Sequence, residues 1–368
     1  MGEGKQSPVR PIKNGEYYHE LIQKNLYLVL LNMGSALKYF SYYLPEKEYA
    51  NEDYFLDFPQ ARENADKLMK IGISSRRHAA KGETASDLAV KSALKLFEEH
   101  ALDRSTIDFV LFCTEQADHI VPATACIIQE RLKLGKHCGA LDYNLACSGF
   151  IYGVAVAKGL IESLGINHVL LLNATTVTST VNPRDGSCRY LFGDGAAATL
   201  ISADTEQKIG AFVFGTDGAR SDKIIIKDGA FRYPLSESSY IETEDEYGNR
   251  QADANLHMNG ASIFNFGLKT VPQLVRDTLA KNNSSMEEMD LFVFHQANRF
   301  LIESIAARLA IPAEKVFNFM EHSGNTVSAT IPIVLAEAVR SGKARTGSKI
   351  LICGFGTGLS WGATVITL

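Results

Sequence analysis

The chain has 368 residues, of which 46% are hydrophobic and 21% are charged, and its formal net charge is −5 at pH 7. A chain of this length can bury a large core, and we expect two fused structural units. The weakly negative charge gives no basic field, which argues against nucleic acid or an anionic membrane as a partner. None of the six cysteines belongs to a Cys-x-x-Cys pair, so we expect reduced thiols and a cytoplasmic protein.

The first residues differ in character from the rest of the chain. We interpret residues 1–25 as a leader that packs loosely, if at all, and we expect the core to begin near Leu26. The apolar run at residues 26–33 is too short to span a bilayer, and the residues before it are polar with mixed charge. We therefore predict neither a signal peptide nor a transmembrane helix.

Beyond this leader, the chain alternates between helix and strand patterns. Apolar residues recur at helical spacing in residues 84–100, whereas residues 107–113 form a continuous apolar run typical of a buried strand. The alternation continues with helices predicted at 122–132 and 147–164, and strands at 139–143, 168–173 and 196–202.

The second part of the chain repeats this rhythm after a polar stretch. Residues 217–259 are rich in charge and turn residues, which predicts an excursion on the surface. After it we predict helices at 261–281, 299–309 and 330–341, and strands at 290–295, 349–354 and 361–368. Strands that alternate with helices indicate a layered α/β fold with mainly parallel pairing. Because the two parts match in pattern rather than in identity, we infer two similar halves, residues 26–205 and 206–368.

Cys147 is the first candidate catalytic residue. It follows an apolar strand and opens a helix, where unpaired N–H groups and the helix dipole favour an anion and should lower its pKa toward neutrality. Its own N–H could also face a developing oxyanion. The alternative is that Cys147 is a small buried apolar residue, as free cysteines often are.

His295 and Asn325 are the second and third candidates. His295 ends the predicted strand at 290–295, and polar residues at the carboxyl end of a strand in an α/β sheet often belong to a site. Asn298 precedes the next helix, and Asn325 lies in a Gly-Asn-Thr loop before another helix. The alternatives are a histidine satisfied in the core and asparagines that only cap a helix or form a turn.

A glycine-rich turn at residues 354–358 follows a strand. Its Gly-x-Gly-x-Gly spacing differs from the Gly-x-Gly-x-x-Gly of dinucleotide-binding turns, and no helix or acidic ribose partner follows. We therefore reject a nucleotide site. A tight glycine turn whose N–H, at Thr357, faces a substrate carbonyl fits the sequence better.

Taken in order along the chain, these and other motifs resemble a known family. The motifs are Gly72-Ile73 with Arg77-His78, Ala146-Cys147-Ser148-Gly149-Phe150, Phe192-Gly193-Asp194-Gly195-Ala196, His295-Gln296-Ala297-Asn298, Gly324-Asn325-Thr326, and Phe355-Gly356 with Trp361-Gly362. Together they resemble the β-ketoacyl-acyl-carrier-protein synthase III enzymes of the thiolase superfamily. The resemblance implies a five-layer αβαβα fold of two similar halves and a homodimer. It also implies that coenzyme A or acyl-carrier-protein thioesters are substrates, without a metal or other cofactor.

The resemblance also implies a role for each site residue. Cys147 would accept the acyl group, while His295 and Asn325 would bind the malonyl thioester carbonyl. The N–H groups of Cys147 and Thr357 would form the oxyanion hole. The substrate pocket would include Phe192, Asn298 and Gly356, together with Val121 as a gate contributed across the dimer. The predicted reaction is a decarboxylating Claisen condensation of an acyl thioester with malonyl-acyl-carrier-protein, in fatty acid or related biosynthesis.

One comparison within the superfamily favours decarboxylation over reversible condensation. Thiolases carry a histidine in Gly-His-Pro where this chain has Gly324-Asn325-Thr326, and they use a second cysteine as a base. Cys353 could pose as that base, but its position inside a predicted strand favours a structural role.

Three departures from the family pattern concern the substrate. Asp66 and Ser179 occupy the positions of the tryptophan and arginine that sandwich the adenine of coenzyme A in well-known members. Val121 replaces a bulky phenylalanine of acetyl-specific members, which would leave room for a longer or branched acyl chain. Phe300 replaces an arginine that docks the acyl-carrier protein; other basic residues could take over that contact, namely Arg299, Arg308 and Lys269.

Two other functions are alternatives to the decarboxylating condensation. The first is an acyltransferase or a head-to-head condensing enzyme that uses the same acyl-Cys147, for which Glu115 could serve as a base. We interpret Glu115 instead as an ordinary loop carboxylate. The second is a non-catalytic subunit that keeps the fold, against which the presence of Cys147, His295 and Asn325 argues.

Overall fold

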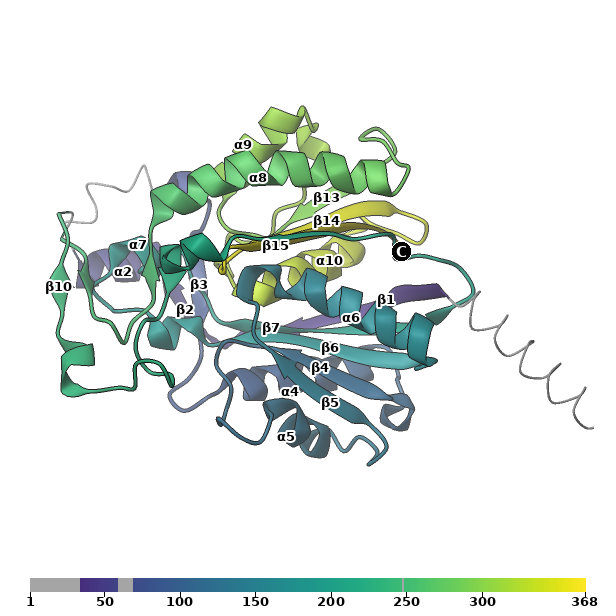
Figure 1. Ribbon diagram of the computed structural model, residues 1–368, viewed down its shortest axis with the longest axis horizontal. Helices are drawn as coiled ribbons and strands as arrows, with labels where there is room; N and C mark the ends of the chain where they lie inside the picture. The colour runs from purple at the N-terminus through teal and green to yellow at the C-terminus, as the bar shows by residue number, and fades with distance from the viewer. Residues whose placement is uncertain (1–33, 59–68, 247) are drawn as a thin grey trace, which may run out of the picture.

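The computed structural model describes residues 34–58, 69–246 and 248–368. Two β-sheets lie between three layers of helices, which confirms the predicted α/β, thiolase-like αβαβα fold (Figure 1). The outer layers hold α8 (Gly260–Lys281) and α9 (Arg299–Leu309) on one side, and α4 (Ala85–Glu99) and α5 (Thr124–Arg131) on the other; the central layer holds α6 (Gly149–Leu164) and α10 (Thr330–Arg340). The predicted leader at residues 1–25 and the start of the core near Leu26 lie outside the described residues.

The five-stranded sheet is built from the first half of the chain. Its strands lie in the order β1 (Gly34–Tyr43), β7 (Gly195–Asp204), β6 (His168–Thr175), β4 (Phe109–Cys113) and β5 (Gly139–Tyr143). The pairs β4–β5 and β4–β6 are parallel, whereas β7 is antiparallel to both of its neighbours. The predicted strands at 107–113, 139–143, 168–173 and 196–202 are confirmed as four of these five.

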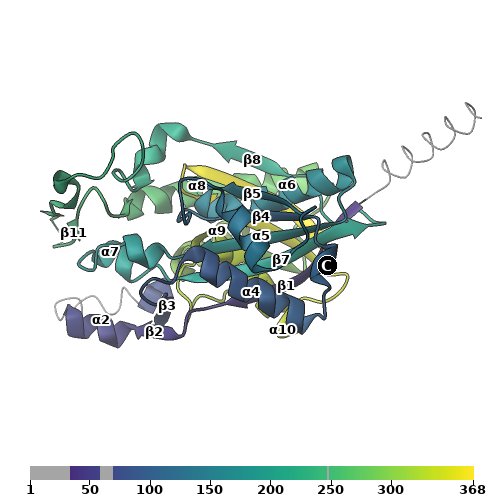
Figure 2. The same cartoon turned by 90° about the horizontal axis from the view of Figure 1, so that it is seen from below.

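The four-stranded sheet is built from the second half. Its strands lie in the order β13 (Leu291–Phe294), β14 (Lys349–Gly356), β15 (Ser360–Thr367) and β8 (Val213–Thr216). The pair β13–β14 is parallel and the other two pairs are antiparallel. Figure 1 shows this sheet edge-on, with α8 and α9 on its outer face, and Figure 2 shows the layers from below, from the side of α4 and α5.

Both sheets follow the same path through space. In the first sheet, β1 is antiparallel to β7, and β7 pairs with β6. In the second sheet, β8 is antiparallel to β15, and β15 pairs with β14. Val316 forms a parallel bridge to Phe292 of β13, at the place that β5 takes beside β4. This repeat supports two similar halves. All strands of the five-stranded sheet precede residue 205 and all strands of the other follow it, while the boundary itself stays a prediction.

Local sequence explains the helices that were predicted. Thr84 caps α4 by accepting a hydrogen bond from the Asp87 N–H, and the Asp87 carboxylate accepts one from the Thr84 N–H. This reciprocal capping satisfies two N–H groups that the first turn leaves unpaired. The helix α6 is apolar because it lies between the two sheets. Ala146–Leu164 is long and apolar enough to cross a membrane by composition alone, but half of that window is buried inside the protein.

Several elements were not predicted. The strand β1 lies at the edge of its sheet and its register shifts between Leu37 and Tyr39, which breaks the alternation that would identify a strand in the sequence. The short elements β2 (Lys47–Ala50), α2 (Asn51–Asp57) and β3 (Ser75–His78) form a satellite structure in which β2 and β3 pair antiparallel. Short elements carry too few residues to show a period.

The excursion at residues 217–259 was only partly predicted. Most of its residues are exposed, as its polar composition suggests. It contains four short strands that form two antiparallel pairs, β9 (Ile224–Ile225) with β12 (His257–Met258) and β10 (Thr243–Glu244) with β11 (Arg250–Gln251). It also contributes apolar side chains to the wall of the main cavity, among them Ile224, Leu235, Tyr240 and Leu256. The prediction of a surface excursion is therefore wrong for Ile224 and Leu256, which are buried, whereas Leu235 and Tyr240 are exposed.

Candidate active site

A single cavity of about 980 Å³ brings together most of the predicted site residues. It lies where the carboxyl ends of strands from both sheets meet, and the 217–259 excursion closes one side. Its wall includes the following predicted site residues: Cys147, Phe192, His295, Asn298, Asn325, Gly356 and Thr357. These residues come from distant parts of the sequence, so the fold rather than any local motif assembles the site.

Cys147 lies in a sharp turn between β5 and α6. Ala146, directly before it, has a φ of 42°, and residues 146–148 form a 3₁₀ turn that leads into α6. A left-handed conformation is uncommon for a residue with a side chain, and such conformations often occur at functional sites. Val327, at the equivalent turn before α10 in the second half, has a φ of 51°. Two matching strained turns therefore meet at the centre of the molecule.

The glycine turn between β14 and β15 packs directly against Cys147. A Cβ atom added to Gly356 would lie 2.6 Å from the Cys147 Cβ and 2.8 Å from its Sγ, so no larger residue fits. The next residue, Thr357, directs its backbone N–H at the Cys147 thiol, and this contact lowers the thiol pKa. The N–H of Thr357 therefore stands where the predicted oxyanion hole requires a donor.

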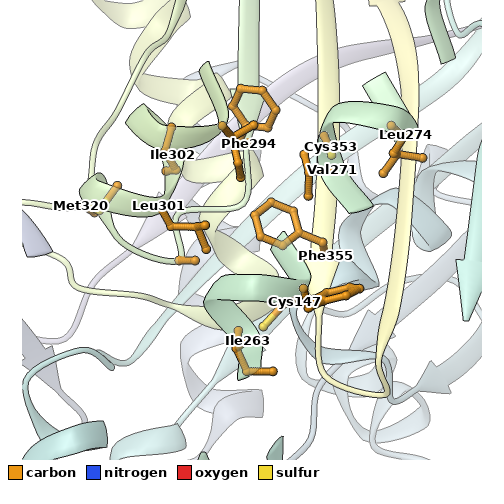
Figure 3. Packing of buried hydrophobic residues seen from close by; sticks show 14 of the residues in the cluster. Cys147, Ile263, Val271, Leu274, Phe294, Leu301, Ile302, Met320, Cys353 and Phe355 are labelled. Carbon is orange, nitrogen blue, oxygen red and sulfur yellow. The ribbon is translucent and has the colours of Figure 1, made fainter. Parts of the chain in front are cut away.

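Burial nevertheless determines the protonation of Cys147. The residue is 6% exposed and belongs to an apolar cluster with Ile263 and Phe355, close to one another in Figure 3. Burial, with a smaller contribution from the charge of Glu115, raises the pKa of the thiol to about 12. The prediction of a pKa near neutrality is therefore wrong for the free protein, because loss of hydration outweighs the donors at the helix N-terminus.

His295 directly follows β13 and is 1% exposed. Its N–H donates to the carbonyl of Cys353 (2.8 Å), and its Nδ1 lies 2.7 Å from the Thr330 hydroxyl oxygen. Burial lowers the pKa of His295 to about 3, so the imidazole is neutral at physiological pH. The Thr330 hydroxyl has one hydrogen, which can go to the Val327 carbonyl (3.0 Å) or to Nδ1. When it goes to Nδ1, the ring carries its own hydrogen on Nε2, which can then donate to a substrate oxygen.

Asn325 is held by the loop that contains Phe192. The Asn325 N–H donates to the carbonyl of Leu191 (2.8 Å), and the Asn325 carbonyl accepts from the Gly193 N–H (3.1 Å). The side-chain Oδ1 accepts from the Val327 N–H (2.9 Å). Because that donor requires an oxygen, the amide orientation is fixed, and Nδ2 is left to donate.

The Gly-Asp-Gly motif at residues 193–195 anchors this loop. The Asp194 carboxylate accepts from the N–H groups of Ala79 (2.8 Å) and Thr178 (2.9 Å) and from the Thr178 hydroxyl (2.5 Å). A Cβ added to Gly193 would lie 2.1 Å from the Ser323 carbonyl oxygen. The motif thus joins the loops of Ala79 and Thr178 to the start of β7. It also brings Phe192 beside Asn325, with which Phe192 forms a parallel bridge.

Comparisons with known proteins agree with this geometry. The family described as 3-oxoacyl-[acyl-carrier-protein] synthase III matches residues 141–218, and the family for its C-terminal part matches residues 279–368. The β-ketoacyl-[acyl-carrier-protein] synthase III of Fusobacterium nucleatum is 33% identical over 333 residues, which cover 90% of this chain and 98% of the relative.

Solved structures show the same likeness. A crystal structure of a 3-oxoacyl-(acyl-carrier-protein) synthase III has a TM-score of 0.89 and 41% identity, covering 91% of this chain and 100% of that chain. The priming β-ketosynthase of the R1128 polyketide pathway has a TM-score of 0.80 and 28% identity, covering 91% of this chain and 96% of that chain. The chain belongs to the 3-oxoacyl-acyl-carrier-protein synthase III family. It is therefore an acyltransferase of the condensing type.

Asn298 and Phe300 line the outer part of the cavity. The Asn298 Oδ1 accepts from the Leu301 N–H (2.8 Å), so this asparagine caps α9 as well as lining the pocket. Phe300 is 51% exposed and stacks on Phe264 with ring centroids 5.3 Å apart. The entrance is therefore aromatic at this point.

The other residues predicted to touch the substrate lie in different places. Val121 is 80% exposed and is not among the residues that line its own chain's cavity. Ser179 lines the cavity, while Asp66 lies outside the described residues. Of the predicted basic contacts, Arg299 is 3.5 Å from Glu321 and Arg308 donates to the Leu268 carbonyl (2.8 Å). Lys269 lies in α8.

Cys353 and Glu115 are the two further candidates for a base. Cys353 is fully buried in β14, burial raises its pKa, and it is not among the residues that line the cavity. Glu115 differs from what the sequence suggested. Its carboxyl is buried, it lines the cavity near Cys147, and neither oxygen has a hydrogen-bond partner among the described residues. The interpretation of Glu115 as an ordinary loop carboxylate is wrong, because the fold buries this carboxyl at the start of a loop that is otherwise mostly exposed.

Proposed function

We propose that this chain condenses an acyl thioester with malonyl-acyl-carrier-protein, with loss of carbon dioxide, through an acyl group on Cys147. The observation that carries this proposal is the pair of donors in the cavity that holds the thiol. His295 is neutral, and the Asn325 amide is oriented with its Nδ2 free to donate. Two neutral donors suit an enolate oxygen, whereas a base strong enough to remove a proton from carbon would need another residue.

In the first step, the sulfur of Cys147 attacks the carbonyl of an acyl thioester. The N–H groups of Cys147 and Thr357 hold the oxyanion, and the carrier thiol leaves with the proton that Cys147 gives up. Because the free thiol has a pKa of about 12, proton removal must accompany the attack rather than precede it.

In the second step, the malonyl group loses carbon dioxide. The electrons of the broken carbon–carbon bond form an enolate, whose oxygen accepts hydrogen bonds from the His295 Nε2–H and the Asn325 Nδ2–H. The enolate carbon attacks the acyl-Cys147 carbonyl. Collapse of that intermediate breaks the carbon–sulfur bond, releases the β-ketoacyl thioester and returns the thiolate of Cys147, which takes up a proton.

A test of this proposal measures carbon dioxide released from carboxyl-labelled malonyl-acyl-carrier-protein. We expect release that depends on an acyl donor and disappears in Cys147→Ala. Asn325→Asp keeps the shape but replaces the amide donor, and we expect about a hundredfold loss of condensation with Cys147 still acylated. Acyl transfer to other acceptors without malonyl-dependent release would instead favour the acyltransferase alternative.

Substrate choice and assembly are part of this proposal. We infer a homodimer in the cytoplasm, in which Val121 of each subunit borders the acyl pocket of the other. The exposure of Ile120 (79%) and Val121 (80%) on adjacent positions supports a covered surface in the assembly. The smaller Val121 would admit longer or branched chains. Light scattering tests the dimer, and Val121→Phe should shift donor preference from octanoyl toward acetyl groups.

Carrier recognition follows from the outer part of the cavity. We infer that Arg299, Arg308 and Lys269, rather than position 300, contact an acidic carrier protein, and that the adenine of coenzyme A is not held by the family's sandwich. The exposed Phe300, which stacks on Phe264, supports this, because it offers an apolar surface in place of a positive charge. A carrier-bound donor that reacts much faster than the same acyl group on coenzyme A would agree with it.

A further inference from the structure

The carboxyl of Glu115 is the least explained group in the cavity. It follows β4 by two residues and lines the same cavity as Cys147. Both of its oxygens are buried without a hydrogen-bond partner among the described residues. Burial dominates and raises its pKa to about 7, while the N–H groups of Glu115 itself and of Ala146 and the Thr175 hydroxyl lower the pKa by a smaller amount.

Two polar side chains near Glu115, those of Gln116 and Tyr143, form hydrogen bonds with other groups. The Gln116 Oε1 accepts from the Thr175 hydroxyl (3.0 Å) and from the Thr176 N–H (3.2 Å), and the Tyr143 hydroxyl donates to the Gly149 carbonyl (2.9 Å). Among the described residues that line the cavity, Lys70 is the only lysine or arginine, and it is exposed. Among the described residues of the cavity wall, no lysine or arginine therefore neutralises this carboxyl. Its oxygens can form hydrogen bonds with a ligand.

A buried carboxyl without a partner costs free energy in the empty protein. Glu115 stands at the Cys147 end of the cavity, where the acyl group is bound, rather than at the aromatic entrance where the carrier arm would lie. We propose that Glu115 is a specificity-determining residue, which selects acyl groups that carry a hydroxyl substituent close to the thioester. This inference rests on the proposed acyl-Cys147, and it names the class of acyl donor.

A hydroxyl group suits Glu115 in either protonation state. It can donate to a carboxylate, and it can also accept from a carboxylic acid. An aliphatic acyl chain of the same shape would leave the carboxyl unpaired in a dry pocket. Sites built to bond a substrate hydroxyl discriminate strongly against analogues that lack it, because the polar group of the site is then unsatisfied.

The test compares two acyl donors of matched shape, 3-hydroxybutyryl-coenzyme A and isovaleryl-coenzyme A. They differ by one hydroxyl in place of one methyl group, and intact mass spectrometry follows the rate at which each acylates Cys147. We expect the full-length protein to prefer the hydroxylated donor by about tenfold or more. Glu115→Gln should keep part of this preference, whereas Glu115→Leu should reverse it.

Asp228→Asn is the matched control. Asp228 is another carboxylate of the cavity wall, but it already accepts from the Ser239 hydroxyl (2.7 Å), so its replacement should leave the preference unchanged. Equal or faster acylation by isovaleryl groups in the unmodified protein would overturn the inference, whether or not the variants fold. A hydroxyl preference that survives in a folded Glu115→Leu would also overturn it.

The same samples separate this inference from the proposed function. Donor preference is measured at the acylation step, before any malonyl thioester is added. If Cys147 is acylated with the expected preference but malonyl-acyl-carrier-protein does not discharge it, the condensation proposal fails and the assignment of Glu115 stands. If discharge occurs and the preference is absent, the reverse holds.

Discussion

Replacement of Gly356 by alanine tests how closely the glycine turn fits the nucleophile. The added Cβ would lie 2.6 Å from the Cβ of Cys147, whereas non-bonded carbon atoms rest at about 3.5 to 4.0 Å. The turn or Cys147 must therefore move by about 1 Å. A shift of that size at reacting atoms can cost about a hundredfold in rate, while overpacking costs about 1 to 3 kcal/mol of unfolding free energy.

The assay is the rate at which Cys147 gains an acyl mass, measured beside the thermal midpoint of unfolding. Gly159→Ala is the matched control, because a Cβ there meets nothing within 4 Å and the residue lies in α6. We expect that variant to acylate normally and to be slightly more stable. A folded Gly356→Ala that acylates Cys147 at the unmodified rate would show that the turn does not confine the nucleophile as described.

Three further predictions concern the protonation of the site. Thr330→Val removes the hydroxyl beside His295 Nδ1 and should slow malonyl discharge by about tenfold with unchanged acylation, whereas Thr330→Ser should restore discharge; equal discharge by both variants would contradict the role of Thr330. Iodoacetamide at pH 7.5 should label the exposed Cys126 well before Cys147, because burial raises the Cys147 pKa to about 12; peptide mass spectrometry would reveal the opposite order if the thiol were activated. The Glu115 pKa is raised from 4.5 to about 7 on folding, so its stabilising contribution is full below pH 4.5 and is lost as pH rises through about 7. Glu115→Gln should therefore gain in relative thermal midpoint between pH 5 and pH 8, and a constant difference would argue against a buried titrating carboxyl.

The sequence predicted those parts of the fold that depend on local pattern. The strand at 139–143 and the helix at 299–309 have the predicted bounds, because each has a clear period and distinct ends. The strand β1 was missed because a register shift breaks its alternation, and β8 because only four of its residues pair. Patterns of this kind depend on the neighbouring strand rather than on the strand itself.

The site also has features that the sequence predicts and features that depend on the tertiary structure. The order of the motifs along the chain predicts Cys147, His295 and Asn325 as site residues, and the fold places all of them in one cavity. The protonation of Cys147 and the burial of Glu115 could not be predicted, since both depend on how loops from separate parts of the chain cover these side chains. The sequence around Glu115 is polar, with Thr114, Gln116 and Asp118 as near neighbours, and it gives no sign that the carboxyl is buried.

The central claim is that Cys147 carries the acyl group and that malonyl-acyl-carrier-protein removes it with loss of carbon dioxide. A single-turnover experiment tests it most directly: the protein is acylated, freed of excess donor and mixed with malonyl-acyl-carrier-protein, and the intact mass of the protein is followed with time. We predict that the acyl mass on Cys147 disappears at the rate at which a β-ketoacyl carrier protein forms. An acyl mass that persists, or a product that forms equally fast in Cys147→Ala, would contradict it.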